Sequence, residues 1–183
     1  MISEISPQKK HDLRVIRAYF LIMIGGMGAA GPFLNITMSR QNLNGAQIGL
    51  VISIGSVIGL FSAPYWTKVQ TENPHPIRML SLSLFFSGLA TVLFGYQVSF
   101  IGIAVFYALR MLFNASHLTT ADMLALKVIR GTNIGYGSIR YLGSVGWVII
   151  VLFTGWLNEK TSIRSGFFLY FFFNLLSIFL LTR

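Results

Sequence analysis

The stretch DMLALKVIRGTNIGYGSIRYLGSVGW, residues 122–147, decides how this chain folds. It connects the end of one long apolar run to the start of the next through a short basic segment. Asp122 lies at the first boundary, and Arg140 and Trp147 lie inside the second run. Charged side chains at membrane depth are rare, because hydrocarbon cannot solvate them, and they are candidate functional groups by default. Whether these residues lie at that depth depends on the rest of the chain.

The composition of the whole chain is typical of a protein embedded in lipid. Of its 183 residues 54% are hydrophobic and only 10% are charged, whereas soluble domains carry about 25% charged residues. The net charge is +9, but the basic residues lie in short segments between apolar runs, where they set topology, so no nucleic-acid binding is expected. The chain has no cysteine, which excludes disulfides and thiolate metal sites. No phosphate loop or metal-ligand cluster occurs, so no cofactor is expected.

Apolar runs long enough to cross a bilayer recur six times along the chain. Each run should be a helix, because a chain in lipid must satisfy its own backbone hydrogen bonds. The expected spans are residues 15–37, 45–67, 77–96, 98–121, 136–157 and 165–183. The sequence therefore predicts an all-α polytopic membrane protein with a polar tail over residues 1–14 and a six-helix domain over 15–183. The first run is too long for a cleavable signal and should remain as a span.

The basic residues predict the orientation of the spans. Segments on the N-terminal side of the membrane hold eight Lys and Arg residues, against three in the connections on the other side. Because Lys and Arg accumulate on the cytoplasmic side, both termini are expected in the cytoplasm. We expect an integral protein of a bacterial inner membrane.

A polar stripe runs along the end of the fourth span. Asn114, His117 and Ala121 share a face at helical spacing, and Arg110 lies one turn before Asn114. Such a stripe should face other helices or a water-filled cavity rather than lipid. Asp122, His117 and Arg110 are candidates for a proton or polar relay, although a lone histidine is more often a packing or hydrogen-bonding group.

The fifth span carries a second polar face. Tyr136, Arg140, Gly143 and Trp147 follow one another at offsets of four, three and four residues, so they line one side of a helix. The guanidinium forks to oxygens, the indole stacks on the apolar face of a ring, and Gly143 would leave space between them. Two other interpretations remain open: Trp147 is a packing aromatic, or Arg140 forms an ion pair with Asp122 that only steadies two helices.

Glycines are regularly spaced in the first two spans. Gly25, Gly28 and Gly31 precede Pro32 in the first span, and Gly45 and Gly49 open a similar ladder in the second. Small residues at such spacing let helix backbones approach closely in lipid. The first ladder indicates either a close-packing face with a kink or a flexible segment lining a pore.

These residues carry a family resemblance. Residues 136–147, YGSIRYLGSVGW, resemble the start of the fifth helix in transporters of the major facilitator superfamily that are similar to lactose permease and to the phenylpropionate and nucleoside proton symporters. Gly31-Pro32-Phe33-Leu34 and Gln47-Ile48-Gly49-Leu50 resemble the end of their first helix and the start of their second. The resemblance covers nearly the whole chain and implies the N-terminal six-helix half of a twelve-helix fold.

The resemblance also implies roles for particular residues. In the sugar-transporting branch a carboxylate late in helix four and the arginine and tryptophan of helix five bind the sugar, which assigns these roles to Asp122, Arg140 and Trp147. Helical spacing adds neighbours, and the full expected substrate-binding set is Asp122, Arg140, Trp147, Tyr136, Gly143 and Asn114.

The conformational loop between the second and third helices departs from the family pattern. Thr67 stands where the family has glycine, Thr71 stands where it has aspartate, and Arg78 keeps a basic residue in place. The match to the latch attributed to that loop is therefore incomplete.

We accordingly expect a secondary active transporter, a proton-coupled symporter of a small polar or aromatic organic solute such as a sugar, nucleoside or aromatic acid. Such transporters place the substrate site between two six-helix halves, so this chain is expected to be an N-terminal half or fragment. The expected partners are the substrate, protons, the lipid bilayer and a second six-helix half. The alternative is a non-transporting membrane scaffold or partner derived from a transporter half.

An intramembrane hydrolase is the remaining class. Gly143-Ser144-Val145-Gly146 only superficially resembles a nucleophile motif. His11 and His75 lie in segments expected outside the membrane, which leaves His117 as the single candidate base. No enzyme is expected.

Overall fold

The computed structural model describes residues 7–182, except for the side chain of Thr71. All the regular secondary structure within that range is helical. The helices are α1 (Pro7–Arg40), α2 (Gly45–Glu72), α3 (Pro76–Phe94), α4 (Phe100–Asn114), α5 (His117–Ile129), α6 (Gly137–Lys160) and α7 (Arg164–Thr182). Six spans are long and apolar enough to cross a membrane, with α4 and α5 together forming one, Phe100–Ile129. The predicted all-α, six-span architecture is confirmed.

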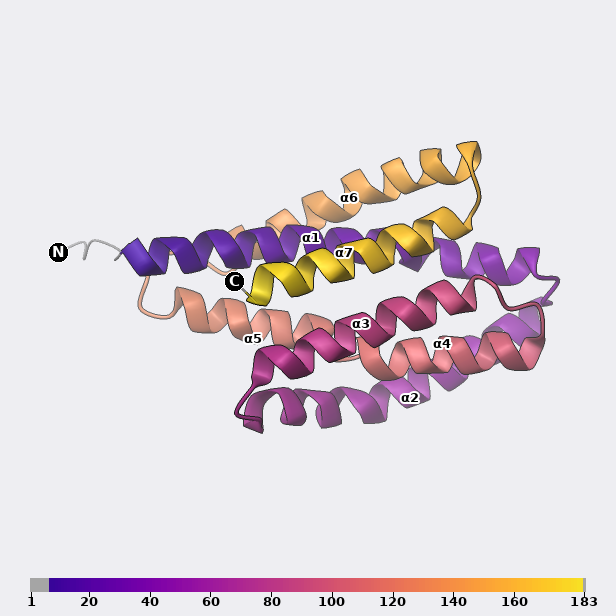
Figure 1. Ribbon diagram of the computed structural model, residues 1–183, viewed down its shortest axis with the longest axis horizontal. Coiled ribbons are helices and arrows are strands. Elements are labelled where there is room, and N and C mark those ends of the chain that lie inside the picture. The colour runs from indigo at the N-terminus through magenta and orange to yellow at the C-terminus, as the bar shows by residue number, and fades with distance from the viewer. Residues whose placement is uncertain (1–6, 183) are drawn as a thin grey trace.

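The spans run up and down through one elongated bundle (Figure 1). Pro7 and Thr182 lie toward one end, together with the connections 73–75 and 130–136; we call this the basic end. The connections 41–44, 95–99 and 161–163 lie at the opposite end. The first predicted residues of the tail, 1–6, and Arg183 lie outside the described residues.

Local sequence signals fix where several helices begin. Asn44 and Gln47 form a reciprocal capping box at the start of α2, and the Ser99 hydroxyl accepts a hydrogen bond from the Gly102 amide at the start of α4. Pro76 begins α3, where its missing N–H would have no partner in any case. These caps satisfy backbone groups that a helix terminus leaves exposed.

The start of α1 and the end of α2 differ from the prediction. α1 begins at Pro7, so residues 7–14 of the predicted tail are helical. α2 continues through Pro64 to Glu72, because a proline removes one donor and neighbouring helices can compensate for that loss in a span. Thr67 and Thr71, predicted in a loop, therefore lie in α2, and Arg78 lies in the first turn of α3.

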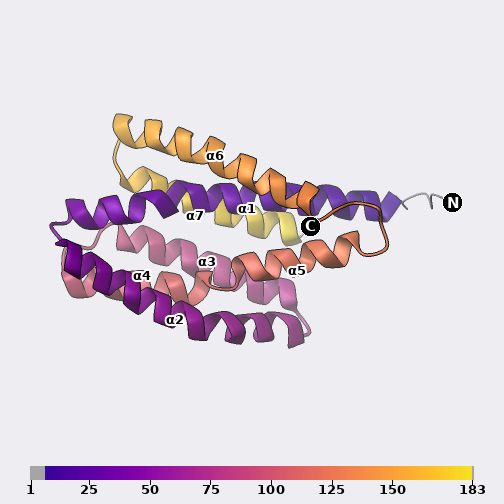
Figure 2. The same cartoon turned by 180° about the vertical axis from the view of Figure 1, so that it is seen from behind.

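The fourth span is broken near its middle, which the sequence reading did not predict. α4 ends at Asn114, and α5 begins at His117 and continues to Ile129 rather than ending at 121 (Figure 2). The Ser116 hydroxyl at the break donates to Gln70 Oε1 of α2 at 3.4 Å. A hydrogen-bonded polar group at the break makes irregular backbone tolerable at this depth, because the break is buried in protein.

Glycines bring α1 and α6 into close contact. A Cβ added at Gly25 would lie 3.3 Å from the Gly146 carbonyl, and one at Gly28 would lie 3.0 Å from the Trp147 oxygen. The close-packing interpretation of the first ladder is thus confirmed. The second ladder packs closely only in its later part: a Cβ at Gly45 or Gly49 would meet nothing within 4 Å, whereas one at Gly55 would lie 2.7 Å from Tyr107 Cδ1 of α4.

Candidate functional site

One cavity opens where α1, α5 and α6 meet. It has a volume of 320 Å³ and is lined by Ile24, Met27, Leu118, Arg140, Ser144, Trp147 and Val148. Arg140 and Trp147 are two turns apart on α6, and the structure places both at this cavity, as their shared helical face predicted. The lining is otherwise largely apolar, so polar recognition there depends on the guanidinium and the Ser144 hydroxyl.

Packing against α1 fixes the position of Trp147. A Cβ at Gly31 would lie 3.2 Å from the indole Cη2 atom, and a Cβ at Gly28 would meet the Trp147 backbone. The residue is still 36% exposed. One edge of the indole therefore packs against Gly31, while Trp147 also lines the cavity. The packing and ring-stacking interpretations of Trp147 are thus compatible.

Asp122 is bonded to Tyr136 rather than to Arg140. The Tyr136 hydroxyl donates to Asp122 Oδ1 at 2.6 Å, across the α5–α6 connection. Ion pairs within the described chain join His11 to Asp12 at 3.7 Å and Lys68 to Glu72 at 3.9 Å, so the Asp122–Arg140 ion pair is absent from it. The interpretation of Arg140 as a helix-steadying ion pair is wrong for this conformation.

The Arg140 side chain has no hydrogen-bonded or ion-paired protein partner among the described residues. The Tyr136 phenol is within electrostatic range of both Arg140 and Asp122. Asp122 also lies one helical turn after Leu118, which lines the cavity. A half-buried guanidinium without a protein partner can offer its donors to oxygens of a molecule in the cavity.

Two members of the expected substrate-binding set lie elsewhere. Gly143 is buried with its α-carbon against Ile24 of α1, so it allows helix contact rather than leaving space beside Arg140. Asn114 Oδ1 accepts a hydrogen bond of 3.2 Å from the Tyr170 hydroxyl of α7. This interior contact separates Asn114 from the cavity and places it with Arg110, whose guanidinium lies over the same Tyr170 ring.

Arg110 and His117 belong to a second polar cluster in the interior of the bundle. The Arg110 side chain, 6% exposed, places its guanidinium carbon 5.8 Å from the centre of the Tyr170 ring. His117 Nε2 lies 3.2 Å from the Ser83 hydroxyl, which in turn is 3.3 Å from Gln70 Nε2. No hydrogen bond or ion pair among the described residues joins these groups to Asp122.

Sequence reasoning missed the partners in this cluster. Gln70 was assigned to a loop, and its side-chain oxygen also accepts from the Thr120 hydroxyl. Ser83 lies in the third span, in which the sequence predicted no site residue other than Arg78 at its start. The available signal was weak: several hydroxyl residues recur in α3, namely Ser81, Ser83, Ser87 and Thr91.

Comparison with known proteins gives a consistent result. The model of the MFS_1 like family matches residues 13–183. The uncharacterized transporter YwbF of Bacillus subtilis (strain 168) is 27% identical over 154 residues, which cover 84% of this chain and 39% of that protein. The maltose permease of Geobacillus stearothermophilus is 27% identical over 151 residues, which cover 82% of this chain and 38% of the permease. The chain thus spans less than two fifths of either relative, and no solved structure matches significantly.

Proposed function

Because this chain belongs to the MFS_1 like family of the major facilitator superfamily, we propose that it is the N-terminal half of a secondary active transporter for a small polar solute. The relatives named as a transporter and a maltose permease support this class. The matched residues cover less than two fifths of each relative, so a second six-helix half, in the same polypeptide or another chain, completes the transporter. A non-transporting partner built from one half remains the alternative.

The observation that carries the proposal is that Arg140 and Trp147 line one cavity and that the Arg140 guanidinium has no bonded partner in the described part of the chain. A planar guanidinium binds two oxygens at once, and an indole covers the apolar face of a ring. A sugar presents both features, and a nucleoside or an aromatic acid presents variants of them. We place a ring-containing solute at this cavity, with Arg140 and Trp147 as its binding residues.

Asp122 and Tyr136 supply the coupling part of the proposal. Asp122 accepts a hydrogen bond from the Tyr136 hydroxyl. A substrate that draws Arg140 toward it changes the charge felt by this pair, because a nearby cation favours an ionised carboxyl group. Asp122 is therefore proposed as the group that exchanges a proton during transport, with His117 and Arg110 acting separately in the interior cluster.

The proposed membrane is the bacterial inner membrane, with the basic end in the cytoplasm. Eight Lys and Arg residues lie in the segments of that end, against three in the opposite connections. In the apolar stretches of α2 and α6, 17% of the residues are buried in the bundle, compared with 56% in that of α1. Such uncovered apolar helices require either lipid or the second half as neighbours.

Arg140→Lys tests the binding site. The matched control is Arg40→Lys, at the C-terminal end of α1. Arg40 is exposed and remote from the cavity. Binding of labelled sugars, nucleosides and aromatic acids is measured on purified protein with its second half. We expect Arg140→Lys to lose the bound solute while inserting normally, because lysine cannot fork to two oxygens. Unchanged binding would remove Arg140 from the site, and no transport by the complete protein would favour the scaffold alternative.

A further inference from the structure

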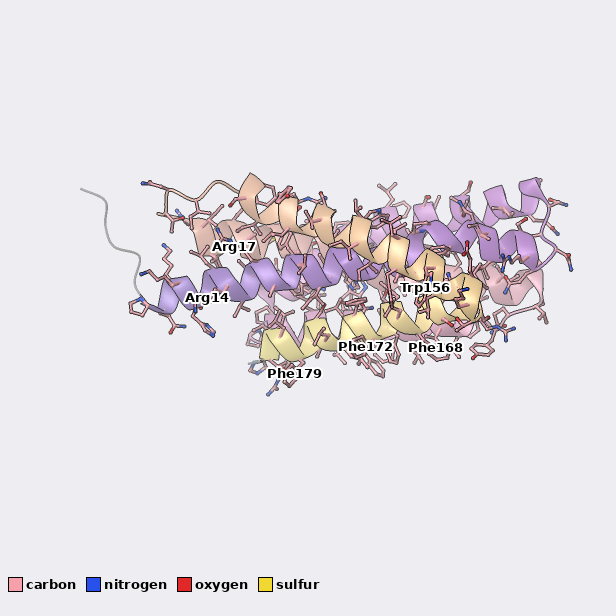
Figure 3. All side chains as sticks on the ribbon, turned by 90° about the horizontal axis from the view of Figure 1, so that it is seen from above. Arg14, Arg17, Trp156, Phe168, Phe172 and Phe179 are labelled. Carbon is pink, nitrogen blue, oxygen red and sulfur yellow. The ribbon has the colours of Figure 1, made fainter. Side chains whose placement is uncertain are left out.

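α1 is uncovered along one side near the basic end. Figure 3 shows α6 and α7 close together at their connection and apart toward the basic end, with α1 visible between them. Arg14 and Leu21 are exposed there, and Arg17, Ala18 and Ile22 are half-buried. We call these five residues the α1 strip.

The strip narrows at Leu21, whose carbonyl packs against Gly146 of α6, and it ends where the neighbouring helices close over α1. A Cβ at Gly25 would touch Gly146 of α6, and one at Gly26 would lie 2.7 Å from Phe173 of α7. Both glycines are buried, unlike the residues of the strip. The strip is therefore a partly exposed face of α1 of limited length, with a cationic outer part and an apolar inner part.

Helix lengths place the cationic part at the level of lipid headgroups. At about 1.5 Å per residue, α7 with 19 residues spans about 28 Å, close to the roughly 30 Å of a hydrocarbon core. α1 has 34 residues and projects beyond the end of α7 at the basic end (Figure 3). In that view Arg14 and Arg17 lie beyond Phe179, the last exposed aromatic of α7.

The charges around the strip favour an anion. Arg14 and Arg17 are preceded by Lys10 on the same helix, and Lys9 donates to the Arg130 carbonyl at 2.7 Å. The one described carboxylate of this segment, Asp12, is near His11 and accepts from Gln8 at 3.3 Å. The buried Arg17 Nε has no hydrogen-bond partner among the described residues. Guanidinium groups bind phosphate through paired donors, which suits these two arginines.

We propose that the α1 strip binds one phospholipid with an anionic headgroup, whose phosphate lies between Arg14 and Arg17. One acyl chain then lies along Leu21 and Ile22, up to the point where α6 and α7 meet over Gly25. Basic recesses between spans on the cytoplasmic side are suited to such lipids. A second copy of the chain fits less well, because two strips face to face would oppose Lys10, Arg14 and Arg17 with the same residues.

The first test is lipid retention by the double variant Arg14→Gln/Arg17→Gln. Native mass spectrometry of the protein in detergent measures retained phosphatidylglycerol against phosphatidylcholine. Each removed cation should weaken anionic-lipid binding about five-fold, or roughly twenty-five-fold for the pair. The control is Arg40→Gln/Lys160→Gln, which removes two cations at the opposite ends of α1 and α6. Equal retention by both double variants would overturn the proposal.

The second test locates the acyl chain. The chain has no cysteine, so Leu21→Cys provides a unique position for a fluorescent label. We expect stronger quenching by phosphatidylglycerol with brominated acyl chains than by the brominated phosphatidylcholine, and no difference after Arg14→Gln/Arg17→Gln. Equal quenching by both lipids in the parent, or a disulfide-linked dimer through position 21 in vesicles, would overturn the proposal.

Two further measurements separate the remaining outcomes. Displacement of the phosphatidylglycerol by millimolar inorganic phosphate would indicate an anion site without lipid specificity and contradict the acyl-chain assignment. If the Gln variant does not fold by circular dichroism, Arg14→Lys/Arg17→Lys takes its place. That variant should keep a preference for phosphatidylglycerol, since the charge remains, but bind it more weakly because paired donors are lost. No weakening would count against the phosphate assignment.

Discussion

Substitution of Gly146 by alanine should separate α1 from α6. A Cβ there would lie 3.3 Å from the Leu21 carbonyl carbon, with the carbonyl oxygen closer still. These are backbone atoms on both helices, so no side chain can rotate away and one helix must shift. Gly155 of the same helix is the matched control, because a Cβ at that position would meet nothing within 4 Å.

Both variants gain helix propensity, and only Gly146→Ala introduces overpacking against α1. Replacing glycine by alanine inside a helix stabilises it by roughly 1 kcal/mol, and overpacking costs about 1–3 kcal/mol. The propensity gain cancels in the comparison, so Gly146→Ala should be less stable than Gly155→Ala by about 1–3 kcal/mol.

The assay is the free energy of unfolding of the two variants in the same detergent, with solute binding measured in parallel. Gly146→Ala should also weaken binding, because the displaced segment carries Trp147 and its neighbours at the cavity. Equal stabilities within about 0.5 kcal/mol would refute the close backbone contact between α1 and α6, since overpacking of backbone atoms should cost more than this.

Trp147→Phe should weaken solute binding about ten-fold, whereas Trp156→Phe, 55% exposed at the far end of α6, should leave it unchanged; a similar loss in both would indicate a general effect of tryptophan on α6. Ser83→Ala should destabilise the protein by about 1–2 kcal/mol, because it leaves Gln70 Nε2 and His117 Nε2 without the buried hydroxyl that they share. The control is Ser81→Ala, two residues earlier on a different side of α3. It removes a buried hydroxyl that has no hydrogen-bond partner among the described residues. It should be neutral or stabilising in thermal unfolding; the reverse order would contradict the interior network.

The sequence alone determined the number of spans and most of their starting points. Each span is a length of apolar residues, and lipid allows a single chain segment little choice but a helix. The starts at Asn44 and Ser99 are local too, because a capping side chain bonds to amides two or three residues away. The glycine ladder of α1 also predicted a close helix contact from the sequence alone, because regularly spaced glycines let a neighbouring helix approach.

Tertiary structure decided which polar groups meet. Asp122 and Arg140 have complementary charges, yet the partner of Asp122 is Tyr136, because the α5–α6 connection brings the phenol to it. Asn114 bonds to Tyr170 of α7 in the interior and does not line the cavity. Periodicity assumes an unbroken helix and names no neighbour across the bundle. The partner of a polar side chain depends on distances between segments far apart in sequence, and those distances exist only after the helices have packed.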